Sequence, residues 1–273
     1  DLSASNALRL GTEEVLRAVS DQTDIVLDVS SLPRIAYLSL MLALLDRLVP
    51  NRDAPVPLAA SKINLQILVG EDAGLDSVIQ SEDPSNELVL IPGFASALQT
   101  ESTRDWPLVW FPVLGENRVS QLQKVMYDQI PDSAEICPVL PHPSRDPRRG
   151  DRLLIEYKVP LFDVSKTPLT NVLYAHESNP FEAYRQLLSA MKRYQRSLSV
   201  IGGCRLVVTP LASKLITLGA ALACYEMKLD IVNGNYGVAI PYAEPKRYSV
   251  STAALRASTP DVSAMVLSGE AYA

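Results

Sequence analysis

The feature that most constrains the fold is a unit that recurs along the chain. An apolar, β-branched run ends in a short polar stretch, and a helix-like segment follows at once. The clear copies cover 24–49, 107–130, 171–194 and 205–227. Strands that alternate with helices in this way are typical of an α/β domain with a largely parallel sheet. Such sheets bind ligands beyond the carboxyl ends of their strands, so the pattern also predicts where a site lies.

The same alternation predicts the individual elements. Strands are expected within 24–29, 63–70, 87–95, 107–117, 152–162, 171–177, 205–210 and 237–242, with an extended segment at 244–250 and an edge strand at 262–269. Helices are expected from an N-cap at Thr12, from the serines after residue 29 to Leu48, and at 118–130, 179–194 and 213–227. A Pro/Ala-rich linker is expected at 52–62. The first strand is apolar on both faces, as a central parallel strand is.

The length of 273 residues suits one large α/β domain or two small ones. The segment 138–151, rich in proline and arginine, is the strongest loop signal in the chain. It either separates two similar lobes, 1–137 and 152–273, or forms a surface excursion within one continuous domain. Both alternatives stay open at the level of the sequence.

The composition of the chain limits the classes of partner that it is expected to bind. The net charge of −6 argues against sequence-independent binding to nucleic acid, although the four arginines in 144–152 form either a local basic patch or a solvated loop. No apolar run approaches the ~18 residues of a membrane span, so no membrane partner is expected. The three cysteines, Cys137, Cys204 and Cys224, are widely spaced, which suits free buried thiols in a reducing compartment. A cytoplasmic protein is therefore expected.

Polar residues follow the predicted strands and should converge, because consecutive parallel strands place their carboxyl ends along one edge of a sheet. The candidate catalytic residues are Asp28, Glu116, His176 and Glu177. The candidate ligand-binding residues are hydroxyls and cations: Ser30, Ser31, Arg34, Arg118, Thr209, Ser213 and Lys214. Hydroxyls and cations at the start of a helix are suited to hold a phosphate group.

Several of these residues also have a structural interpretation. N-capping of a helix would explain Ser213, and Asn179 with Glu182 fits a capping box. That capping box does not require His176 or Glu177, which are therefore either an acid/base pair, contacts to a ribose, or satisfied edge residues.

Two acidic residues have similar alternatives. Glu116 and Arg118 flank a capping candidate, Asn117, and they either contact a ligand or pair with each other. Asp28 lies inside an apolar strand, where a buried carboxylate requires a partner. That partner is either a protein group or a ligand.

The sequence lacks the residue patterns of several kinds of metal, catalytic and cofactor site. Two histidines, His142 and His176, and three scattered cysteines give no metal-ligand spacing, so no metal is expected. The chain has no GxSxG elbow and no Gly-rich phosphate loop, and no cofactor is expected.

Four short fragments carry a resemblance: Asp28–Ser31, Ile91–Phe94, Pro210–Leu222 and Tyr242–Tyr248. In this order they resemble uncharacterised bacterial Rossmann-like α/β proteins, some of which are encoded near antiviral or mobile-element genes. The resemblance implies a mostly parallel sheet with helices on both faces. It also implies a bacterial cytosolic accessory or sensor protein.

Three classes of function remain. The first is a binding or sensing module that holds a nucleotide-like or phosphorylated small ligand at the strand ends and acts in a larger assembly, with a protein partner or as a homo-oligomer. The second is a hydrolase or glycosidase acting on a nucleotide-like substrate, with Asp28, Glu116 or Glu177 as the carboxylate. The third is a structural subunit without a ligand. Whether the chain is an enzyme is left open by the sequence, and the binding module is our hypothesis.

Overall fold

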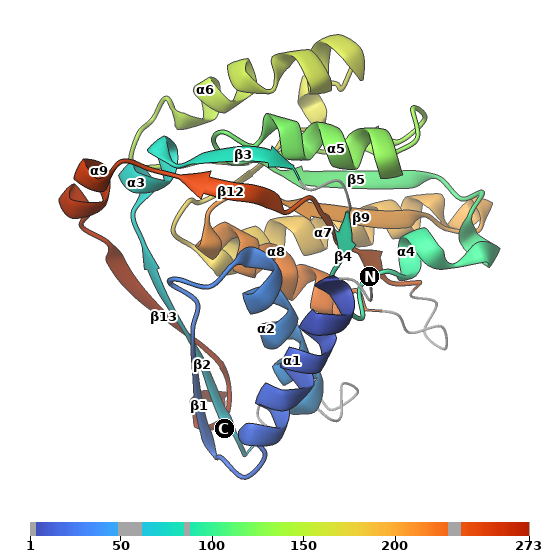
Figure 1. The fold of residues 1–273 in the computed structure, drawn as a ribbon. Coiled ribbons are helices and arrows are strands. Elements are labelled where there is room, and N and C mark those ends of the chain that lie inside the picture. Colours follow the sequence, from blue (N-terminus) through green and yellow to red (C-terminus); the bar gives the residue numbers. More distant parts are fainter. Residues whose placement is uncertain (1–3, 49–61, 85–87, 229–235, 273) are drawn as a thin grey trace. The chain divides into compact units, whose positions relative to one another are not determined.

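The computed structural model describes residues 4–48, 62–84, 88–228 and 236–272. Contacts within the chain define two compact units (Figure 1). Unit 1 comprises Asp1–Asp72 and Ser258–Ala273, and unit 2 comprises Ala73–Ala257. The segment 138–151 lies within unit 2. All but the last residue of the expected linker at 52–62 lies outside the described residues.

Unit 1 contains a three-stranded sheet with the order β1-β2-β13. Strands β1 (Asp24–Asp28) and β2 (Asn64–Glu71) are parallel, and β13 (Asp261–Ser268) runs antiparallel to β2. The other elements are α1 (Ala4–Ala18), α2 (Arg34–Leu48) and the 3-10 turn η5 (Glu270–Tyr272). The predicted edge strand near 262–269 and the predicted end of a helix at Leu48 are confirmed.

Two expectations for unit 1 are wrong. Helix α1 begins at Ala4, so Thr12 is not its N-cap, and the Thr12 Oγ1 instead donates to the Leu8 carbonyl inside the helix (2.8 Å). Strand β1 is an edge strand and not a central one, and its Val26 is 63% exposed. Val26 is apolar although it is exposed, so the sequence of β1 has the pattern of a strand that is buried on both faces.

Unit 2 is built on a parallel sheet with the order β10-β9-β5-β7-β8, and β6 pairs with β5. The strands are β5 (Leu108–Val113), β6 (Glu135–Ile136), β7 (Val139–Pro141), β8 (Leu173–Ala175), β9 (Arg205–Pro210) and β10 (Val238–Ala239). Helices α5 (Val119–Gln129) and α6 (Arg149–Glu156) cover one face, and α7 (Pro180–Leu198) and α8 (Lys214–Glu226) cover the other (Figure 1). This confirms the predicted α/β, Rossmann-like fold class.

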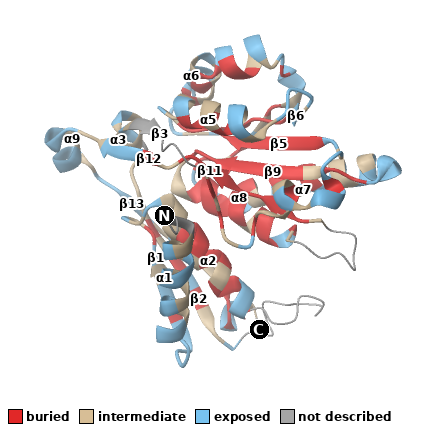
Figure 2. Cartoon of the chain, turned by 45° about the vertical axis from the view of Figure 1, so that its right-hand side comes forward, coloured by how far each residue is buried: buried red, intermediate tan, exposed pale blue. Residues whose placement is uncertain are grey.

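The two central strands of this sheet form the core of unit 2. Every residue of β5 is buried, and in β9 only Arg205 is not (Figure 2). Both strands are apolar on both sides because helices cover both faces of the sheet.

Shorter elements surround the sheet. Two antiparallel pairs join β11 (Pro241–Tyr242) to β4 (Val89–Leu90) and β12 (Pro245–Ser249) to β3 (Gln80–Pro84). The remaining elements are α3 (Ala73–Val78), α4 (Ser96–Gln99), η1 (Glu101–Thr103), η3 (Leu169–Asn171), η4 (Ser199–Ile201) and α9 (Thr252–Ala257). Of the strand expected within 87–95, only β4 forms, and the strand expected at 237–242 is divided into β10 and β11.

The strand expected at 152–162 is wrong. Helix α6 and a π-helical turn, η2 (Lys158–Val164), occupy that segment. Arg149, Leu153, Tyr157 and Leu161 are buried at intervals of four residues, whereas Ile155 is 73% exposed. That spacing is helical, and the apolar residues between the buried ones concealed it.

The strand order reverses between β5 and β9. From β5 the chain proceeds through α5 to β7, towards one edge of the sheet, whereas from β9 it proceeds through α8 to β10, towards the other edge. In open α/β sheets, a crevice forms at the carboxyl ends of the strands at such a switch point. The fold of unit 2 therefore predicts a ligand site at the loops after β5 and β9.

Within the described ranges, no helix combines the length and the apolar character needed to cross a bilayer.

Candidate functional site

The carboxyl edge of the unit 2 sheet brings together some of the predicted site residues and not others. Those that follow strands of this sheet are Glu116, Arg118, His176, Glu177, Ser213 and Lys214. Asp28 is the last residue of β1, on the separate sheet of unit 1, and Ser30, Ser31 and Arg34 follow it. The expectation of a single edge is therefore wrong, because β1 pairs with β2 and not with a strand of unit 2.

Asp28 does not need the buried partner that the sequence predicted, since its side chain is exposed. Its carboxylate accepts a hydrogen bond from the Ser30 N–H (2.9 Å), and hydrogen bonds from Ser30 lower the pKa of Asp28. The Ser30 Oγ in turn accepts from the Gly70 N–H (2.7 Å), which links the loop after β1 to β2. Local turn geometry accounts for both residues.

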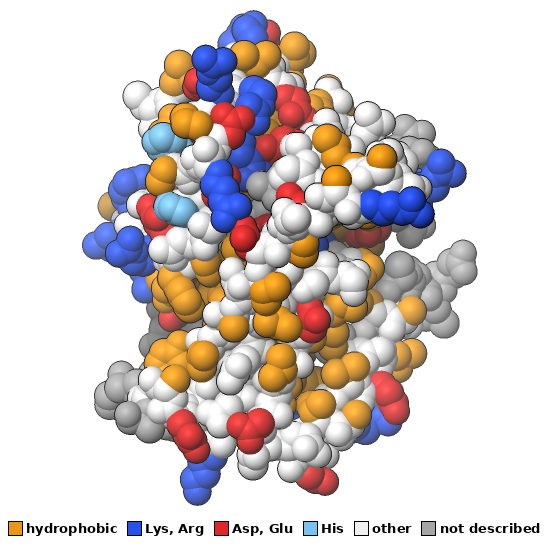
Figure 3. Space-filling model, turned by 90° about the vertical axis from the view of Figure 1, so that its left-hand side faces the viewer, with side chains coloured by type: hydrophobic (Ala, Val, Ile, Leu, Met, Phe, Trp, Pro, Cys, Tyr) orange, Lys and Arg blue, Asp and Glu red, His pale blue; other side chains and the backbone are white. Residues whose placement is uncertain are grey.

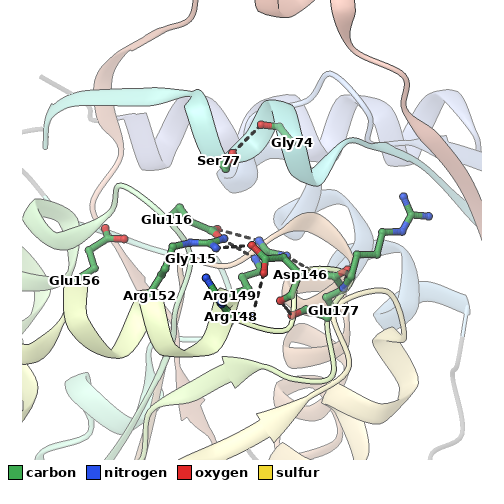
Figure 4. A network of polar contacts seen from close by, with 12 residues as sticks. Gly74, Ser77, Gly115, Glu116, Asp146, Arg148, Arg149, Arg152, Glu156 and Glu177 are labelled. Atoms are coloured by element: carbon green, nitrogen blue, oxygen red, sulfur yellow. Dashed lines mark hydrogen bonds and ion pairs between the residues drawn. The ribbon is translucent and has the colours of Figure 1, made fainter.

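A buried ion cluster dominates the carboxyl edge of unit 2 (Figure 4). The Arg149 Nε and Nη2 donate to the two Glu116 oxygens at 2.6 and 2.8 Å, and Nη1 donates to a Glu177 oxygen at 2.8 Å. The three side chains are only 6%, 13% and 8% exposed. The other Glu177 oxygen accepts from the Arg145 N–H (2.6 Å). The cluster therefore joins the loops after β5, β7 and β8 to α6.

The electrostatics of the cluster keep Glu116 charged. Burial alone would raise the pKa of Glu116, but the hydrogen bonds and charge of Arg149 outweigh burial and lower it. The pKa of Arg149 is raised because the two carboxylates outweigh the effect of its own burial. Glu116 and Glu177 are thus both engaged by Arg149, and neither is placed as a free general acid or base.

Arg149 is a site residue that the sequence did not indicate, and Glu116 pairs with it and not with Arg118, which was one of the two alternatives for Glu116. Arg118 donates to Ser81 Oγ and to the Asn117 carbonyl, each at 3.1 Å, and its guanidinium lies 5.5 Å from the centre of the Tyr248 ring. Arg149 was one of four arginines in a stretch that looked like a solvated loop. The only available signal was the four-residue spacing of Arg149 with buried apolar residues.

Asn117 is not the cap that the sequence indicated. The N-cap position of α5 is Arg118, and no side chain caps it. Asn117 has a left-handed backbone (φ 58°), and its Nδ2 donates to the Ser77 carbonyl (3.0 Å). Asparagine tolerates this conformation better than most residues, so Asn117 fixes the sharp turn after β5.

Glu156 is a second residue that the sequence did not indicate. Its Oε1 accepts from the Asn117 N–H (2.8 Å), so it contacts the loop after β5 from α6. Burial and the nearby charge of Glu116 raise the pKa of Glu156, against the opposing effects of backbone hydrogen bonds and of Arg118. Figure 4 shows its carboxylate apart from the ion cluster.

The loop after β8 follows the predicted capping pattern in part. The Asn179 Oδ1 accepts from the Glu182 N–H (3.3 Å), and Pro180 occupies the first turn of α7. The His176 Nδ1 accepts from the Ser178 N–H (3.2 Å), a local contact within the loop. Figure 3 shows both histidines at the surface among mixed cationic and acidic side chains, so the surface there has no single sign of charge.

The loop after β9 differs from the other loops. The Thr209 Oγ1 is fully buried and accepts from the Trp110 Nε1 (2.9 Å), so a bond between β9 and β5 accounts for Thr209. Ser213 is the N-cap residue of α8, but its side chain makes no capping hydrogen bond. Its Oγ is buried and has no hydrogen-bond partner in the part of the chain that the structure describes. The capping interpretation of Ser213 is therefore wrong.

A glycine lets the loops after β5 and β9 approach each other. A Cβ at Gly115 would collide with the backbone of Leu211 and Ala212. The Tyr157 hydroxyl, buried beneath this loop, donates to the Gly115 carbonyl (2.7 Å). At this junction the loops after β5 and β9 therefore meet backbone to backbone, beside Ser213.

The described residues contain no group of three or more His, Cys, Asp or Glu side chains placed to hold a metal ion. All three cysteines are free and buried, as the sequence indicated. Burial raises the pKa of Cys137 and of Cys204 to about 11 in each case, which makes these thiols unreactive at neutral pH.

No protein-family model matches the sequence, and no curated protein matches it. Arguments about function therefore depend on the geometry of the site.

Proposed function

We propose that unit 2 is a binding or sensing module that holds a phosphorylated, nucleotide-like small molecule beyond the carboxyl ends of β5 and β9. The observation that carries this proposal is the buried Ser213 Oγ, which has no hydrogen-bond partner among the described residues. An unsatisfied buried hydroxyl costs about 1–3 kcal/mol, so such a group calls for an explanation. A ligand oxygen that accepts from Ser213 would supply one.

The surroundings of Ser213 favour an anionic ligand. Ser213 stands at the start of α8, a 13-residue helix whose N-terminus carries a partial positive charge. Backbone N–H groups at such a helix end suit a phosphate, and Lys214 adds a cation at the next position. The strand order reverses at this point, which is where open α/β sheets bind ligands.

Other residues at the carboxyl edge of the unit 2 sheet hold the loops around Ser213 in place. Arg149 holds the loops after β5 and β8 through buried hydrogen bonds, and Gly115 brings the loop after β5 against the loop after β9. Loops held in this way need little ordering when a ligand binds, which favours affinity.

The wider setting is part of the same proposal. We place the module in the bacterial cytoplasm, within a larger assembly that serves antiviral defence, with a protein partner or as a homo-oligomer. What supports this setting is the resemblance carried by four short fragments and the presence of three free, buried thiols.

A thermal-shift screen with inorganic phosphate, nucleotides and sugar phosphates tests the binding. A ligand that binds only the native state raises the unfolding temperature. Ser213→Ala is the informative variant, because it removes the hydroxyl without placing a charge at a buried position. We expect this variant to fold normally and to lose the shift.

Thr167→Val is the matched control, because Thr167 Oγ1 is another buried hydroxyl that has no partner in the described ranges. It should keep the full shift. An undiminished shift in Ser213→Ala would remove Ser213 from the site, and a flat response to every ligand would favour a structural subunit.

Hydrolysis of a nucleotide-like substrate is the second candidate, and Glu156 is the observation that favours it. Near the end of β5, the pKa of Glu156 is raised while that of Glu116 is lowered. A carboxyl group with a raised pKa is suited to act as a general acid, whereas Glu116 is held by Arg149. Mass spectrometry of each ligand that binds would reveal turnover, which Glu156→Gln should then abolish.

A further inference from the structure

The outer face of α7 carries an array of cations. Arg185, Lys192, Arg193 and Arg196 are all exposed. Residues 185, 192 and 196 are separated by seven and four positions, which places them along one stripe of a helix. The opposite face is buried through Ala183, Leu187, Ala190 and Met191. The cations therefore point away from the core of unit 2.

These cations are not neutralised within the described chain. Among the described residues, none of the four forms an ion pair, and the only carboxylate on α7 is Glu182. The helix is thus strongly cationic in a chain whose net charge is −6. Such segregation leaves a local positive field on an acidic protein.

Helix stability does not account for the array. Cations in the last turn interact favourably with the helix dipole, which explains Arg196. Arg185 lies in the second turn, near the positive end of the dipole, where a cation gives no such stabilisation. An explanation outside the helix is needed for the array as a whole.

Apolar side chains lie at both ends of the cationic stripe. Val200 and Ile201, in η4 directly after α7, are 86% and 58% exposed. Phe181, four residues before Arg185, is 44% exposed at the other end. Exposed aliphatic side chains in a turn beside a row of cations fit the boundary between headgroups and acyl chains of a lipid bilayer.

We propose that the outer face of α7, together with η4, docks on an anionic membrane surface. The four cations contact lipid headgroups, and Val200 and Ile201 enter the boundary below the headgroups. This mode of binding needs no spanning helix, so the absence of a long apolar segment in the sequence does not bear on it. A nucleic-acid backbone would match the cations but would leave the two aliphatic side chains in water.

Each cation near an anionic surface contributes about fivefold to binding, and the contribution falls within a Debye length as salt rises. Co-sedimentation of the full chain should therefore occur with vesicles of phosphatidylcholine and phosphatidylserine and not with phosphatidylcholine alone. High salt should release the protein. The double variant R193Q/R196Q should bind roughly 25-fold more weakly.

Matched controls separate this face from general effects of charge or apolarity. Arg256→Gln removes an exposed cation from α9, and Val159→Glu adds a charge at an exposed valine of η2. Both should bind as the unaltered chain does, whereas Val200→Glu should weaken binding. Unfolding temperatures should not change in any variant, because every altered residue is exposed.

Three results would overturn the proposal. One is an absence of binding to either vesicle. A second is equal loss of binding in the α7 variants and the two controls. The third is α7-dependent binding to a labelled oligonucleotide without binding to vesicles, which would assign the face to nucleic acid.

Discussion

The ends of β1 and β5 look alike in sequence and differ in structure. Each strand end carries an acidic residue with small polar neighbours, Asp28 as the last residue of β1 and Glu116 three residues after β5. Asp28 is exposed and accepts from a backbone N–H two residues away. Glu116 is 13% exposed and pairs with Arg149, 33 residues away. The same kind of residue at the same kind of position is thus stabilised locally in unit 1 and over a long range in unit 2.

The difference arises from what lies beyond each strand. The sheet of unit 1 has β1 at its edge, so a carboxylate at its end remains hydrated. In unit 2, β5 is central, with helices on both faces, so a carboxylate at its end is desolvated and requires a cation. The position of the strand in its sheet, and not the local sequence, decides how an acidic residue at the end of the strand is stabilised.

Arg149→Met is the change expected to have the largest effect on this comparison. It leaves two buried carboxylates without their cation, which costs about 3–5 kcal/mol in the free energy of unfolding. Urea unfolding followed by tryptophan fluorescence measures the loss. Arg152→Met, which breaks the exposed pair with Asp146, should cost only a small fraction of that. Equal losses would show that Arg149 is hydrated and not buried.

Gly115→Ala tests the close approach beside this cluster and should have the next largest effect. The new methyl group collides with backbone atoms of Leu211 and Ala212, which cannot move as a flexible side chain does. A cost of about 1–3 kcal/mol in the free energy of unfolding is expected. Gly150→Ala in α6, where a Cβ would meet only the Pro141 carbonyl of β7 at an ordinary 3.9 Å, should instead stabilise by about 0.5–1 kcal/mol. A neutral Gly115→Ala variant would contradict the packing of the two loops.

Glu156→Gln should raise stability slightly at neutral pH. The pKa of Glu156 is raised in the folded state, so its stabilising contribution is present at low pH and is lost as pH rises through the folded pKa. Glutamine keeps an acceptor for the Asn117 N–H without the charge. Unfolding curves from pH 4 to pH 8 should therefore converge at the acid end and separate above it. A variant less stable at pH 7 would reverse this sign.

Asp28→Asn should have the smallest effect. Asparagine also accepts the hydrogen bond from the Ser30 N–H, and the exposed charge has no buried partner to leave behind. The unfolding temperature at pH 7 should match that of the unaltered chain. A large loss would mean that unit 1 depends on this carboxylate as unit 2 depends on Arg149.

The spacing of apolar residues and the composition of each segment were sufficient to predict much of unit 2. The strands β5, β8 and β9 and the helices α5, α7 and α8 were all anticipated, because long apolar runs and helical spacing are local signals. The segment 152–162 was not, because its buried residues Leu153, Tyr157 and Leu161 continue a four-residue spacing that begins at an arginine, Arg149. An arginine is rarely fully buried unless it is paired, and the sequence does not reveal its partners.

For the candidate site, the sequence determined which residues end up after the strands of the sheet, since strand ends are set by local patterns. Only the tertiary structure decided that β1 belongs to another sheet, that Glu116 and Glu177 share Arg149, and that Ser213 has a buried hydroxyl without a partner among the residues that the structure describes. The physical reason is that burial and hydrogen-bond partners depend on strand pairing and on contacts 28–40 residues apart. The order of residue types along the chain does not show which distant residues make such contacts.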